Sequence, residues 1–559
     1  MELPTAPQHL HFIYTQWKQK GNMAMPNYSI LIQPHCDSEG LCRLSISLTL
    51  DSPARKAHDV LCEFAPDVQG VPTHNYTKEN LSAVDAAGHL NLSCVPRGGA
   101  ALSNHVWVVE RDTVGPVALQ LEVLPKLVDA KTPVGPQVDL RRDQGGLLGS
   151  GGWFLPSIPR QERFLFSVQW DLSRVTAGTR ACWSYGEGPE RTEQEGPLPL
   201  LLNSLFMVGP VNSQRVEHGS AVWSTVYWIG DLPDYLGPVK DFSKHMVPYA
   251  YSAFEDEMEN YSIFIRKSLK GYVGNNFASS LLLQYSDERG KVDDADLISI
   301  LTHELMHNWL YLGSNPGESQ NMWYIEGIAQ FYAVFLPVRA GFRKADYFRR
   351  VMSQFLCAYY TNPLIEVPLR ETEGAFYSDP SAQWTPYMRG FVYLLLVDAS
   401  LRQASSASAR RQNPIDDVVM SLTRRNRQVA DKQYQTLIDG GTLHLSSDFT
   451  FPVAEYLFML RPVEQEVFEL GFNAKSLRSG VVEGVLARSR AALAGLQNGD
   501  VIQHFSRVSV ALMDSQKTVS FSVTRVGQDK EIKGEFRPRS FDKVCSFQAV
   551  RVDHSTAFP

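Results

Sequence analysis

The chain has 559 residues, of which 44% are hydrophobic and 20% are charged, and its formal net charge is −7. These proportions are ordinary for a soluble globular protein, and the length predicts about three or four domains. The mild negative charge and the lack of a long basic block exclude a typical nucleic-acid-binding protein. No apolar run approaches the roughly 18 residues of a membrane helix, and the N-terminus lacks the basic start and apolar core of a secretory signal. We therefore expect a cytoplasmic protein with no nucleic-acid or membrane partner.

Seven cysteines are scattered along the chain without a Cys-x-x-Cys pair or another metal-ligand spacing. An odd and sparse set in a large chain predicts reduced, mostly buried thiols and no disulfide framework. Such thiols agree with the expected cytoplasmic location.

The first part of the chain is predicted to be rich in β-strands. Apolar and polar side chains alternate in short segments, which clusters of Pro, Gly and Asn separate: residues 28–32, 42–50, 105–109, 163–170 and 221–228. After an N-terminal extension of residues 1–25, we expect a β-rich domain, with two packed sheets, over residues 26–175. The glycine-rich residues 144–152 lack the Gly-Lys-Ser/Thr ending of a phosphate-binding loop, so we interpret them as a flexible loop.

Helical periodicity dominates from about residue 240 to residue 437, and one helix in this region carries a metal-binding pattern. The string His303-Glu304-Leu305-Met306-His307 places two histidines four residues apart, on the same face of a helix. Acidic residues at 293, 294 and 296 suit the helix N-terminus, and apolar residues then repeat at three- and four-residue steps as far as Trp309. We expect Gly313 and Pro316 to end this helix.

A second apolar stretch, residues 322–332, contains Glu326 among hydrophobic neighbours. A carboxylate in such surroundings is costly unless a positive charge neutralises it. Two neutral imidazoles and one carboxylate are a common zinc-binding set, with a fourth position open for water. We therefore predict that His303, His307 and Glu326 bind Zn²⁺ and that Glu304, beside the first ligand, takes a proton from the water. The alternative is a surface helix with two unrelated histidines.

The polar residues 405–413 are predicted to separate two helices, the second of which begins at Pro414. Farther along, residues 461–545 are predicted to form a separate module, followed by a tail of residues 546–559. The module contains Leu470-Gly471-Phe472 near its start and the string Ala-Gly-Leu-x-x-Gly-Asp-Val-Ile over residues 494–502.

These two strings resemble a PDZ domain, in which a short loop offers backbone amides to the carboxylate of a peptide C-terminus. Leu470, Gly471 and Phe472 would form that loop. Two interpretations remain open: the module captures a peptide or protein C-terminus, or it packs against the catalytic domain and has a structural role.

The β-rich front, the helical zinc region and the PDZ-like module together resemble the glycyl aminopeptidase family of metallopeptidases. These are gluzincins, related to aminopeptidase N and leukotriene A hydrolase. The resemblance covers about residues 26–545 and is strongest at residues 303–307, 323–327 and 386–390. It implies a multidomain α+β fold, with a thermolysin-like helical zinc catalytic domain over residues 176–460.

The resemblance also implies a catalytic tyrosine, which the family places in a Tyr-x-Lys-Gly string ahead of an apolar helix. Tyr387-Met388-Arg389-Gly390 matches this string except that arginine replaces lysine. Tyr387 would donate a hydrogen bond to the tetrahedral oxyanion.

One stretch departs from the family pattern. Aminopeptidases carry a Gly-x-Met-Glu-Asn or similar string before the zinc helix, and its glutamate holds the free amine of the substrate. The corresponding residues 274–280, Gly-Asn-Asn-Phe-Ala-Ser-Ser, contain no acid. Loss of one partner from such a charge pair can cost several kcal/mol.

The resemblance implies a zinc metallopeptidase, and the leading hypothesis is an aminopeptidase that removes small N-terminal residues such as Gly or Ala from peptides. Two alternatives remain: a metallopeptidase that does not depend on a free N-terminus, and a catalytically inactive PDZ scaffold that binds peptides. The missing acid favours the first alternative. Glu304 argues against the second, because zinc binding alone does not need that base.

Overall fold

The computed structural model describes most of the chain in two compact units, Met1–Gly317 and Glu318–Pro559. The described residues are 25–38, 40–51, 53–97, 104–129, 132, 136–159, 163–218, 221–257, 260–269, 272–287, 294–310, 322–376, 378–404, 413–425, 432–525, 527 and 531–552.

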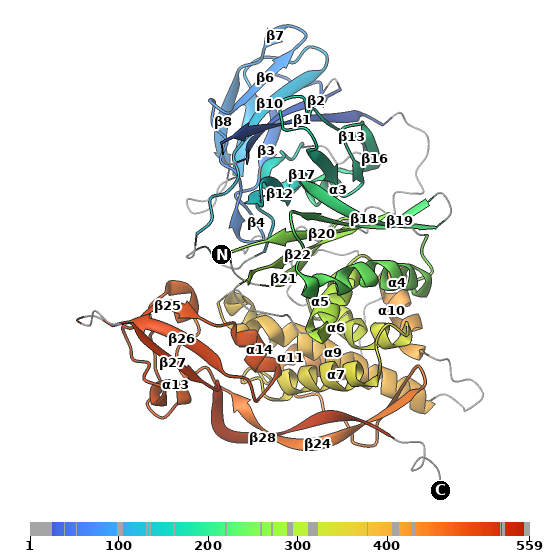
Figure 1. Ribbon diagram of the computed structural model, residues 1–559, viewed down its shortest axis with the longest axis vertical. Coiled ribbons are helices and arrows are strands. Elements are labelled where there is room, and N and C mark those ends of the chain that lie inside the picture. The colour runs from blue at the N-terminus through green and yellow to red at the C-terminus, as the bar shows by residue number, and fades with distance from the viewer. Residues whose placement is uncertain are drawn as a thin grey trace. The chain divides into compact units, whose positions relative to one another are not determined.

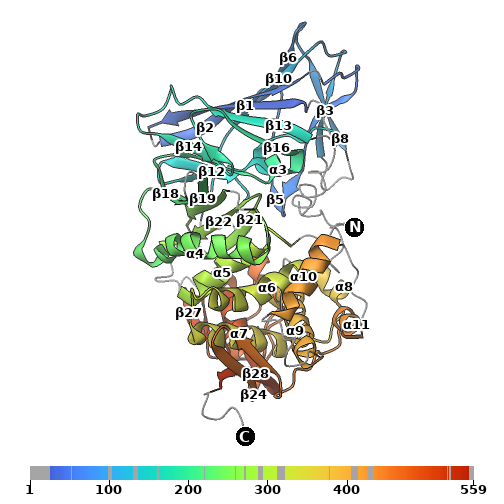
Figure 2. The ribbon, with the colours of Figure 1, turned by 90° about the vertical axis from the view of Figure 1, so that its right-hand side faces the viewer.

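The N-terminal part of the first unit is built from β-sheets, as the alternating sequence pattern predicts (Figure 1). A seven-stranded sheet has the order β16-β13-β1-β2-β10-β6-β7, and Figure 2 shows β1, β2 and β13 side by side. Its strands are β1 (Asn27–Asp37), β2 (Gly40–Leu50), β6 (Leu81–Asp85), β7 (Gly88–His89), β10 (Val117–Val123), β13 (Arg163–Trp170) and β16 (Thr192–Pro197).

Smaller sheets complete this N-terminal part. A five-stranded sheet has the order β11-β12-β17-β14-β15, a three-stranded sheet the order β3-β9-β8, and β4 pairs with β5. The strands are β3 (Val60–Phe64), β4 (Asp67–Val68), β5 (Val71–Pro72), β8 (Leu92–Arg97), β9 (Asn104–Val109), β11 (Arg141–Asp143), β12 (Gly146–Ser150), β14 (Arg180–Trp183), β15 (Gly186–Glu187) and β17 (Leu205–Gly209). The short helices α2 (Gly151–Phe154) and α3 (Leu198–Leu202) connect strands.

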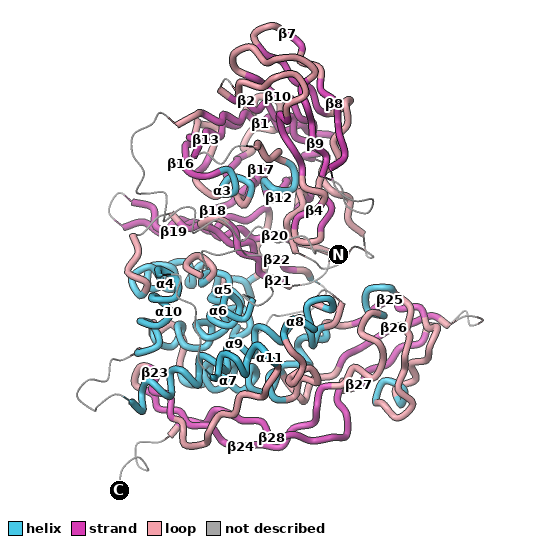
Figure 3. The backbone as a smooth tube through the Cα atoms, turned by 180° about the vertical axis from the view of Figure 1, so that it is seen from behind, coloured by secondary structure: helices cyan, strands magenta, loops and turns pink. Residues whose placement is uncertain are grey.

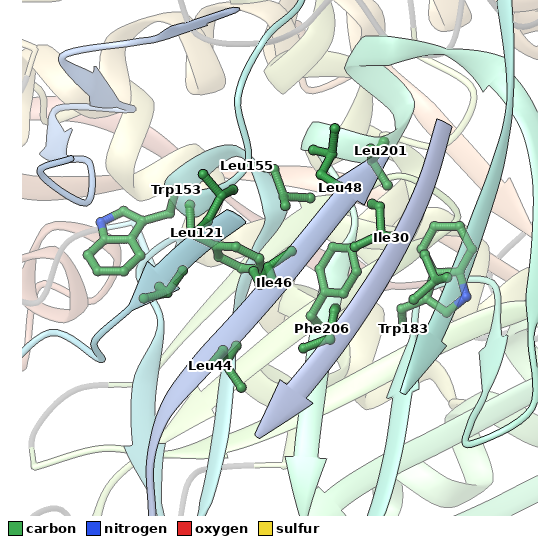
Figure 4. Close-up of a cluster of buried hydrophobic side chains, with 14 of the residues drawn as sticks. Ile30, Leu44, Ile46, Leu48, Leu121, Trp153, Leu155, Trp183, Leu201 and Phe206 are labelled. Carbon is green, nitrogen blue, oxygen red and sulfur yellow. The ribbon is translucent and has the colours of Figure 1, made fainter. Parts of the chain in front are cut away.

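The hydrophobic core of this N-terminal part lies between the seven-stranded sheet and the five-stranded sheet (Figure 4). Ile30 pairs with Leu48 across β1 and β2, and Ile32 pairs with Ile46. All four side chains point to the same face because side chains of a strand alternate between its faces. They pack in one cluster with Phe206 of β17 and Trp183 of β14. Full burial of an aliphatic side chain of this size stabilises the fold by about 1.5–3 kcal/mol.

The glycine-rich residues 144–152 are not the flexible loop that we expected. They contain β12 and the start of α2, and every residue of β12 is buried. A Cβ on Gly149 would lie 2.5 Å from the Cα of Leu140, and one on Gly146 would lie 2.6 Å from the carbonyl oxygen of Val208. The glycines therefore allow close backbone packing, a reason for glycine that sequence alone does not separate from loop flexibility.

The rest of the first unit is a mixed five-stranded sheet with helices, of the order β18-β19-β20-β22-β21. β19, β20 and β22 are parallel, and the edge strands β18 and β21 are antiparallel to their neighbours. The expected helical region from residue 240 therefore includes three strands. The elements are β18 (Val211–His218), β19 (Ala221–Ile229), η1 (Asp234–Leu236), α4 (Pro238–Ala253), β20 (Tyr261–Lys267), β21 (Val273–Phe277), β22 (Ser280–Tyr285) and α5 (Asp294–Met306).

A buried ionic network joins β11 to β20 within this unit. The side chains of Arg266 and Asp139 are both 0% exposed, and their charged atoms are 3.5 Å apart. Asp139 also accepts two hydrogen bonds from Arg141. Burial raises the pKa of Asp143 to about 6, although its carboxylate accepts a hydrogen bond from the backbone N–H of Lys267.

The second unit begins with a group of helices (Figure 1). α6 (Met322–Arg339) is buried from Trp323 to Val338, so it is a central helix with hydrophobic contacts all round. The other elements are α7 (Ala345–Tyr360), α8 (Leu369–Thr372), η4 (Glu373–Ala375), α9 (Pro380–Ala404), α10 (Pro414–Arg425) and α11 (Lys432–Asp439). The predicted helix start at Pro414 is confirmed.

Two long antiparallel strands, β24 (Tyr456–Phe468) and β28 (Arg539–Arg551), run side by side in the C-terminal part (Figure 3). With β23 (Thr450–Val453) they form one sheet, and a second sheet has the order β25-β26-β27. The remaining elements are α12 (Ser476–Ser479), α13 (Arg490–Leu493), β25 (Val501–Phe505), α14 (Val508–Met513), β26 (Val519–Thr524) and β27 (Ile532–Phe536).

The observed architecture is a mixed α+β fold with a β-rich N-terminal region, as expected. Among the described residues, no helix is both long enough and apolar enough to cross a membrane. All seven cysteines are described and are free thiols. Only Cys62, Cys182 and Cys357 are buried, so the expectation of mostly buried thiols was wrong.

Candidate metal site

Of the two histidines of the predicted metal site, His303 lies in the last turn of α5 and His307 directly follows the helix. Asp294 and Asp296 occupy the first turn, as expected, and Asp293, Gly313 and Pro316 lie outside the described residues. The helix ends at Met306, earlier than predicted, and a tight turn follows in which the N–H of Trp309 donates to the carbonyl of Met306.

Aromatic packing fixes the backbone that follows His307. Trp309 stacks on Phe254 of the α4 region, with ring centroids 5.0 Å apart, and its indole N–H donates to Asp256 at 3.0 Å. The amide of Asn308 contacts the hydroxyl of Tyr251 at 3.4 Å. The chain directly after His307 is therefore held by side chains in the last turn of α4 and just after it.

The predicted ligand residues offer atoms that lie close together. The Nε2 atoms of His303 and His307 are 3.1 Å apart. One atom from each of His303, His307 and Glu326 lies within 4.8 Å of the other two. His303 and Glu326 are buried, at 8% and 7% exposure, and His307 is partly buried.

This geometry and chemistry fit a zinc ion. Zinc–nitrogen bonds of about 2.0–2.1 Å at a tetrahedral angle place two imidazole nitrogens about 3.3 Å apart, near the separation of the two Nε2 atoms. Two imidazoles and one carboxylate are a ligand set that zinc prefers when one coordination position stays open. The group carries a negative charge when the imidazoles are neutral, so a cation would balance it.

Glu304, the predicted base, packs against the edge strand β21. A Cβ on Gly274 would lie 2.6 Å from the Cγ of Glu304 and 3.0 Å from its Oε1. The side-chain amide of Asn276 donates to the carbonyl oxygen of Glu304 at 3.2 Å. The stretch that lacks the expected acid therefore makes room for the Glu304 side chain. One sequence contains no signal that would have assigned this contact to Gly274.

A buried phenol lies in the electrostatic field of Glu304. Tyr261, at the start of β20, is 0% exposed. Burial raises its pKa well above the usual range, and electrostatic interactions with Tyr251 and with the Glu304 carboxylate act in the same direction. Tyr261 therefore stays neutral and keeps its proton at physiological pH.

Tyr387 lies on α9, directly after a proline within the helix. Its ring is partly buried and packs against Trp384 with centroids 5.1 Å apart. Arg389, two residues farther along α9, is 1% exposed and donates to backbone carbonyls of residues 364, 365 and 367 and of Leu437. Burial lowers the pKa of Arg389 to about 10, so it remains charged at neutral pH.

The predicted peptide-binding loop of the C-terminal module is well packed. Leu470 and Phe472 are 8% and 6% exposed, and Gly471 has a φ of 82°. The carbonyl of Gly471 accepts hydrogen bonds from the N–H of Leu486 and the hydroxyl of Ser489. A turn and the short helix α12 follow this loop directly. A strand that a C-terminal peptide could extend is therefore missing there, among residues 473–479, all of which are described.

Comparisons with known proteins show the fold. No protein-family model matches the chain, and no curated protein matches it by sequence. The crystal structure of an aminopeptidase N family protein from Idiomarina loihiensis is similar over 93% of this chain and 98% of that chain, with 13% sequence identity and a TM-score of 0.60.

Two further structures overlap in part. The M1 zinc metallopeptidase from Deinococcus radiodurans matches over 75% of this chain and 95% of that chain, with 15% identity and a TM-score of 0.44. Yeast LTA4 hydrolase matches over 74% of this chain and 64% of that chain, with 14% identity and a TM-score of 0.44. The fold is thus that of the Idiomarina loihiensis aminopeptidase N family protein, in agreement with the resemblance found in the sequence.

Proposed function

We propose that this protein is a zinc-dependent metallopeptidase that hydrolyses peptide bonds, with His303, His307 and Glu326 as the zinc ligands. The observation that supports this most strongly is the mutual proximity, within 4.8 Å, of two imidazole nitrogens and one carboxylate oxygen. The likeness of the fold to an aminopeptidase N family protein supports the same reaction class.

Zinc bound there would polarise the scissile carbonyl and lower the pKa of the attacking water toward neutrality. Glu304 accepts the proton of that water and passes it to the leaving amine. Its side chain packs on β21, where the absence of a side chain at Gly274 leaves space for its Cγ and Oε1. Tyr387 donates a hydrogen bond to the oxygen on which negative charge develops.

The substrate preference that we propose is for small N-terminal residues such as Gly or Ala. The family resemblance supports this choice, whereas β21 favours a second candidate, a peptidase that does not need a free amine. β21 contains no acidic residue that could pair with a free amine, and the Asn276 side-chain amide donates to the backbone carbonyl of Glu304. The two candidates predict different effects of blocking the substrate's amine: the aminopeptidase should lose cleavage of the blocked peptide, whereas the second candidate should keep it.

The test uses the purified full-length protein, an alanine-terminated peptide and the same peptide with an acetylated N-terminus. Metal analysis before and after addition of Zn²⁺ measures the zinc content. One equivalent of zinc with cleavage of the free peptide alone supports the aminopeptidase. Equal cleavage of both peptides supports the second candidate, and a protein that neither contains nor takes up zinc contradicts both.

We also propose that residues 461–545 form a PDZ-like module whose role is structural. Arg539, 0% exposed, donates to the hydroxyl of Thr361 at 2.8 Å and to the carbonyls of Ala511 and Leu512 in α14. The backbone N–H of Phe468 donates to the carbonyl of Thr361 at 2.9 Å. These bonds attach the module to the end of α7, which favours the packing interpretation over capture of a C-terminus at Leu470, Gly471 and Phe472.

The remaining domain limits are proposals of the same kind. They comprise an N-terminal extension of residues 1–25, a β-rich domain of residues 26–175, a catalytic domain of residues 176–460 and a tail of residues 546–559. The paired strands β24 and β28 extend beyond residues 461–545. β24 begins at Tyr456, before the module, and β28 ends at Arg551, after it.

A further inference from the structure

Two glycines, Gly327 and Gly390, lie at a close backbone contact between α6 and α9. A Cβ on Gly327 would lie 2.4 Å from the Cα of Gly390, and one on Gly390 would lie 2.1 Å from the carbonyl oxygen of Trp323. Both distances are shorter than any stable contact, and the atoms that would be met belong to the backbone. A side chain at either position therefore cannot be accommodated by rotation of a neighbour, and the helices would have to separate.

These glycines lie beside two residues of the proposed reaction. Gly327 directly follows Glu326 on α6, and Gly390 is three residues after Tyr387 on α9, almost one helical turn along the same face. Helix backbones normally stay about 8–10 Å apart because side chains separate them. At the two glycines no side chain separates the helices, and the backbones touch directly. This contact fixes the separation of α6 and α9 close to Glu326 and Tyr387.

Arg389 holds α9 from another direction at the same turn. Its guanidinium donates to carbonyls of residues 364, 365 and 367 and of Leu437, none of which belongs to α6. Because these bonds restrain α9, a side chain at the crossing cannot be relieved by a free shift of that helix. The displacement would pass to the neighbouring side chains, since packed interiors transmit strain.

We infer that Gly327 and Gly390 are positioning residues, which set the distance between the carboxylate of Glu326 and the hydroxyl of Tyr387. This inference rests on the proposed function. Glycine is unfavourable within a helix compared with alanine, so its presence at both sides of one contact needs a local cause. The backbone contact is that cause.

The test compares Gly327→Ala and Gly390→Ala with the matched control Gly374→Ala. Gly374 lies in the same unit, and an added Cβ there meets no atom within 4 Å. Three quantities are measured for each full-length variant: the zinc dissociation constant by competition with a chelator, kcat and KM for a peptide, and the thermal midpoint. We expect both crossing variants to lose at least tenfold in kcat, and Gly327→Ala to bind zinc at least tenfold more weakly, with Gly374→Ala unchanged.

A double-mutant comparison separates positioning from general destabilisation. If Gly390 acts through Tyr387, Gly390→Ala should reduce kcat far less in a Tyr387→Phe background than in the wild type. Equal losses in the two backgrounds, or a lower thermal midpoint with unchanged kcat and zinc affinity, would overturn the inference.

If the alanine variants do not fold, the milder variant Arg389→Lys is tested in their place. It keeps the charge but loses the planar set of donors. We expect its kcat to fall at least threefold with unchanged zinc affinity, and an unchanged kcat overturns the inference. A wild-type protein without zinc or turnover contradicts the proposed function itself. An active wild type with unaffected variants contradicts only the positioning role.

Discussion

Two groups of buried charged side chains, the ionic network of the first unit and the candidate metal site, are balanced differently. In the network of the first unit, the carboxylates of Asp139 and Asp143 lie with the cations of Arg141, Arg266 and Lys126, so positive charges accompany the negative ones. At the candidate metal site, two imidazoles and the carboxylate of Glu326 carry a net negative charge when the imidazoles are neutral. Buried side chains whose charges compensate one another need no bound ion. A buried group with excess negative charge favours the binding of a cation.

The pKa directions in the network agree with this view. Burial acts to raise the pKa of Asp139, but Arg266, Arg141 and Lys126 outweigh it and the pKa is lowered. Burial also lowers the pKa of Arg266, to about 10. Both groups therefore stay charged at neutral pH and stabilise each other. We accordingly expect changes in the network to affect stability, and changes at the metal site to affect zinc binding and turnover.

The largest effect is expected for Glu304→Gln. The amide cannot accept the proton of the attacking water, so kcat should fall by about 10²–10⁴-fold. Zinc content should stay at the wild-type level because Glu304 is not a proposed ligand, and Glu326→Gln is the matched variant that should lose zinc affinity. A Glu304→Gln protein with wild-type kcat would remove this residue from the mechanism.

Arg266→Met should show the opposite pattern. Loss of the guanidinium leaves Asp139 with a reduced set of buried partners, which should lower the free energy of unfolding by about 3–5 kcal/mol. Arg142→Met is the control, because Arg142 pairs with Asp37 at the surface and such pairs contribute about 0–1 kcal/mol. Urea unfolding measures both, and equal stabilities of the two variants would contradict the assigned role of the network.

Tyr387→Phe should lower kcat by about 10²–10³-fold, because one hydrogen bond to the developing oxyanion is lost. KM and zinc content should change little. Tyr393→Phe removes a hydroxyl from the same helix, at a ring that packs on Trp323, and serves as the control. Similar kcat values for the two variants would exclude Tyr387 from oxyanion stabilisation.

The smallest effect concerns the pH dependence of stability. Because burial raises the pKa of Asp143 to about 6, the folded state binds its proton more tightly than the unfolded state does. The contribution of this group is therefore fully present below about pH 4 and is lost as the pH rises to about 6, by up to about 3 kcal/mol. Asp143→Asn should lack this loss, so its stability relative to the wild type should increase between pH 4 and 7 in urea unfolding. A constant difference across that range would contradict the raised pKa.

The strands of the N-terminal region were predictable because period-two alternation identifies a strand with one buried face. The patterns at residues 28–32, 42–50 and 163–170 all lie within observed strands. The helical pattern around residues 261–285 failed for a physical reason. β20 and β22 are buried on both faces and so carry continuous apolar side chains, which resemble a buried helix in sequence.

For the candidate site, the His303-to-His307 spacing predicted the shared helix face, because four residues make about one turn. The apolar neighbours of Glu326 predicted its burial. Neither pattern contains the contacts of Gly274 with Glu304 and of Gly327 with Gly390. A glycine in a sequence has the same appearance whether it allows a turn, a flexible loop or a close backbone approach.

The sequence by itself determined the ligand types, their spacing and the proposed base, because these depend on side-chain chemistry and local helix geometry. Only the tertiary structure decided that three side chains far apart along the chain lie within 4.8 Å of one another. It also decided that glycines allow the site's supporting backbones to touch, because such contacts depend on the paths of several segments at once.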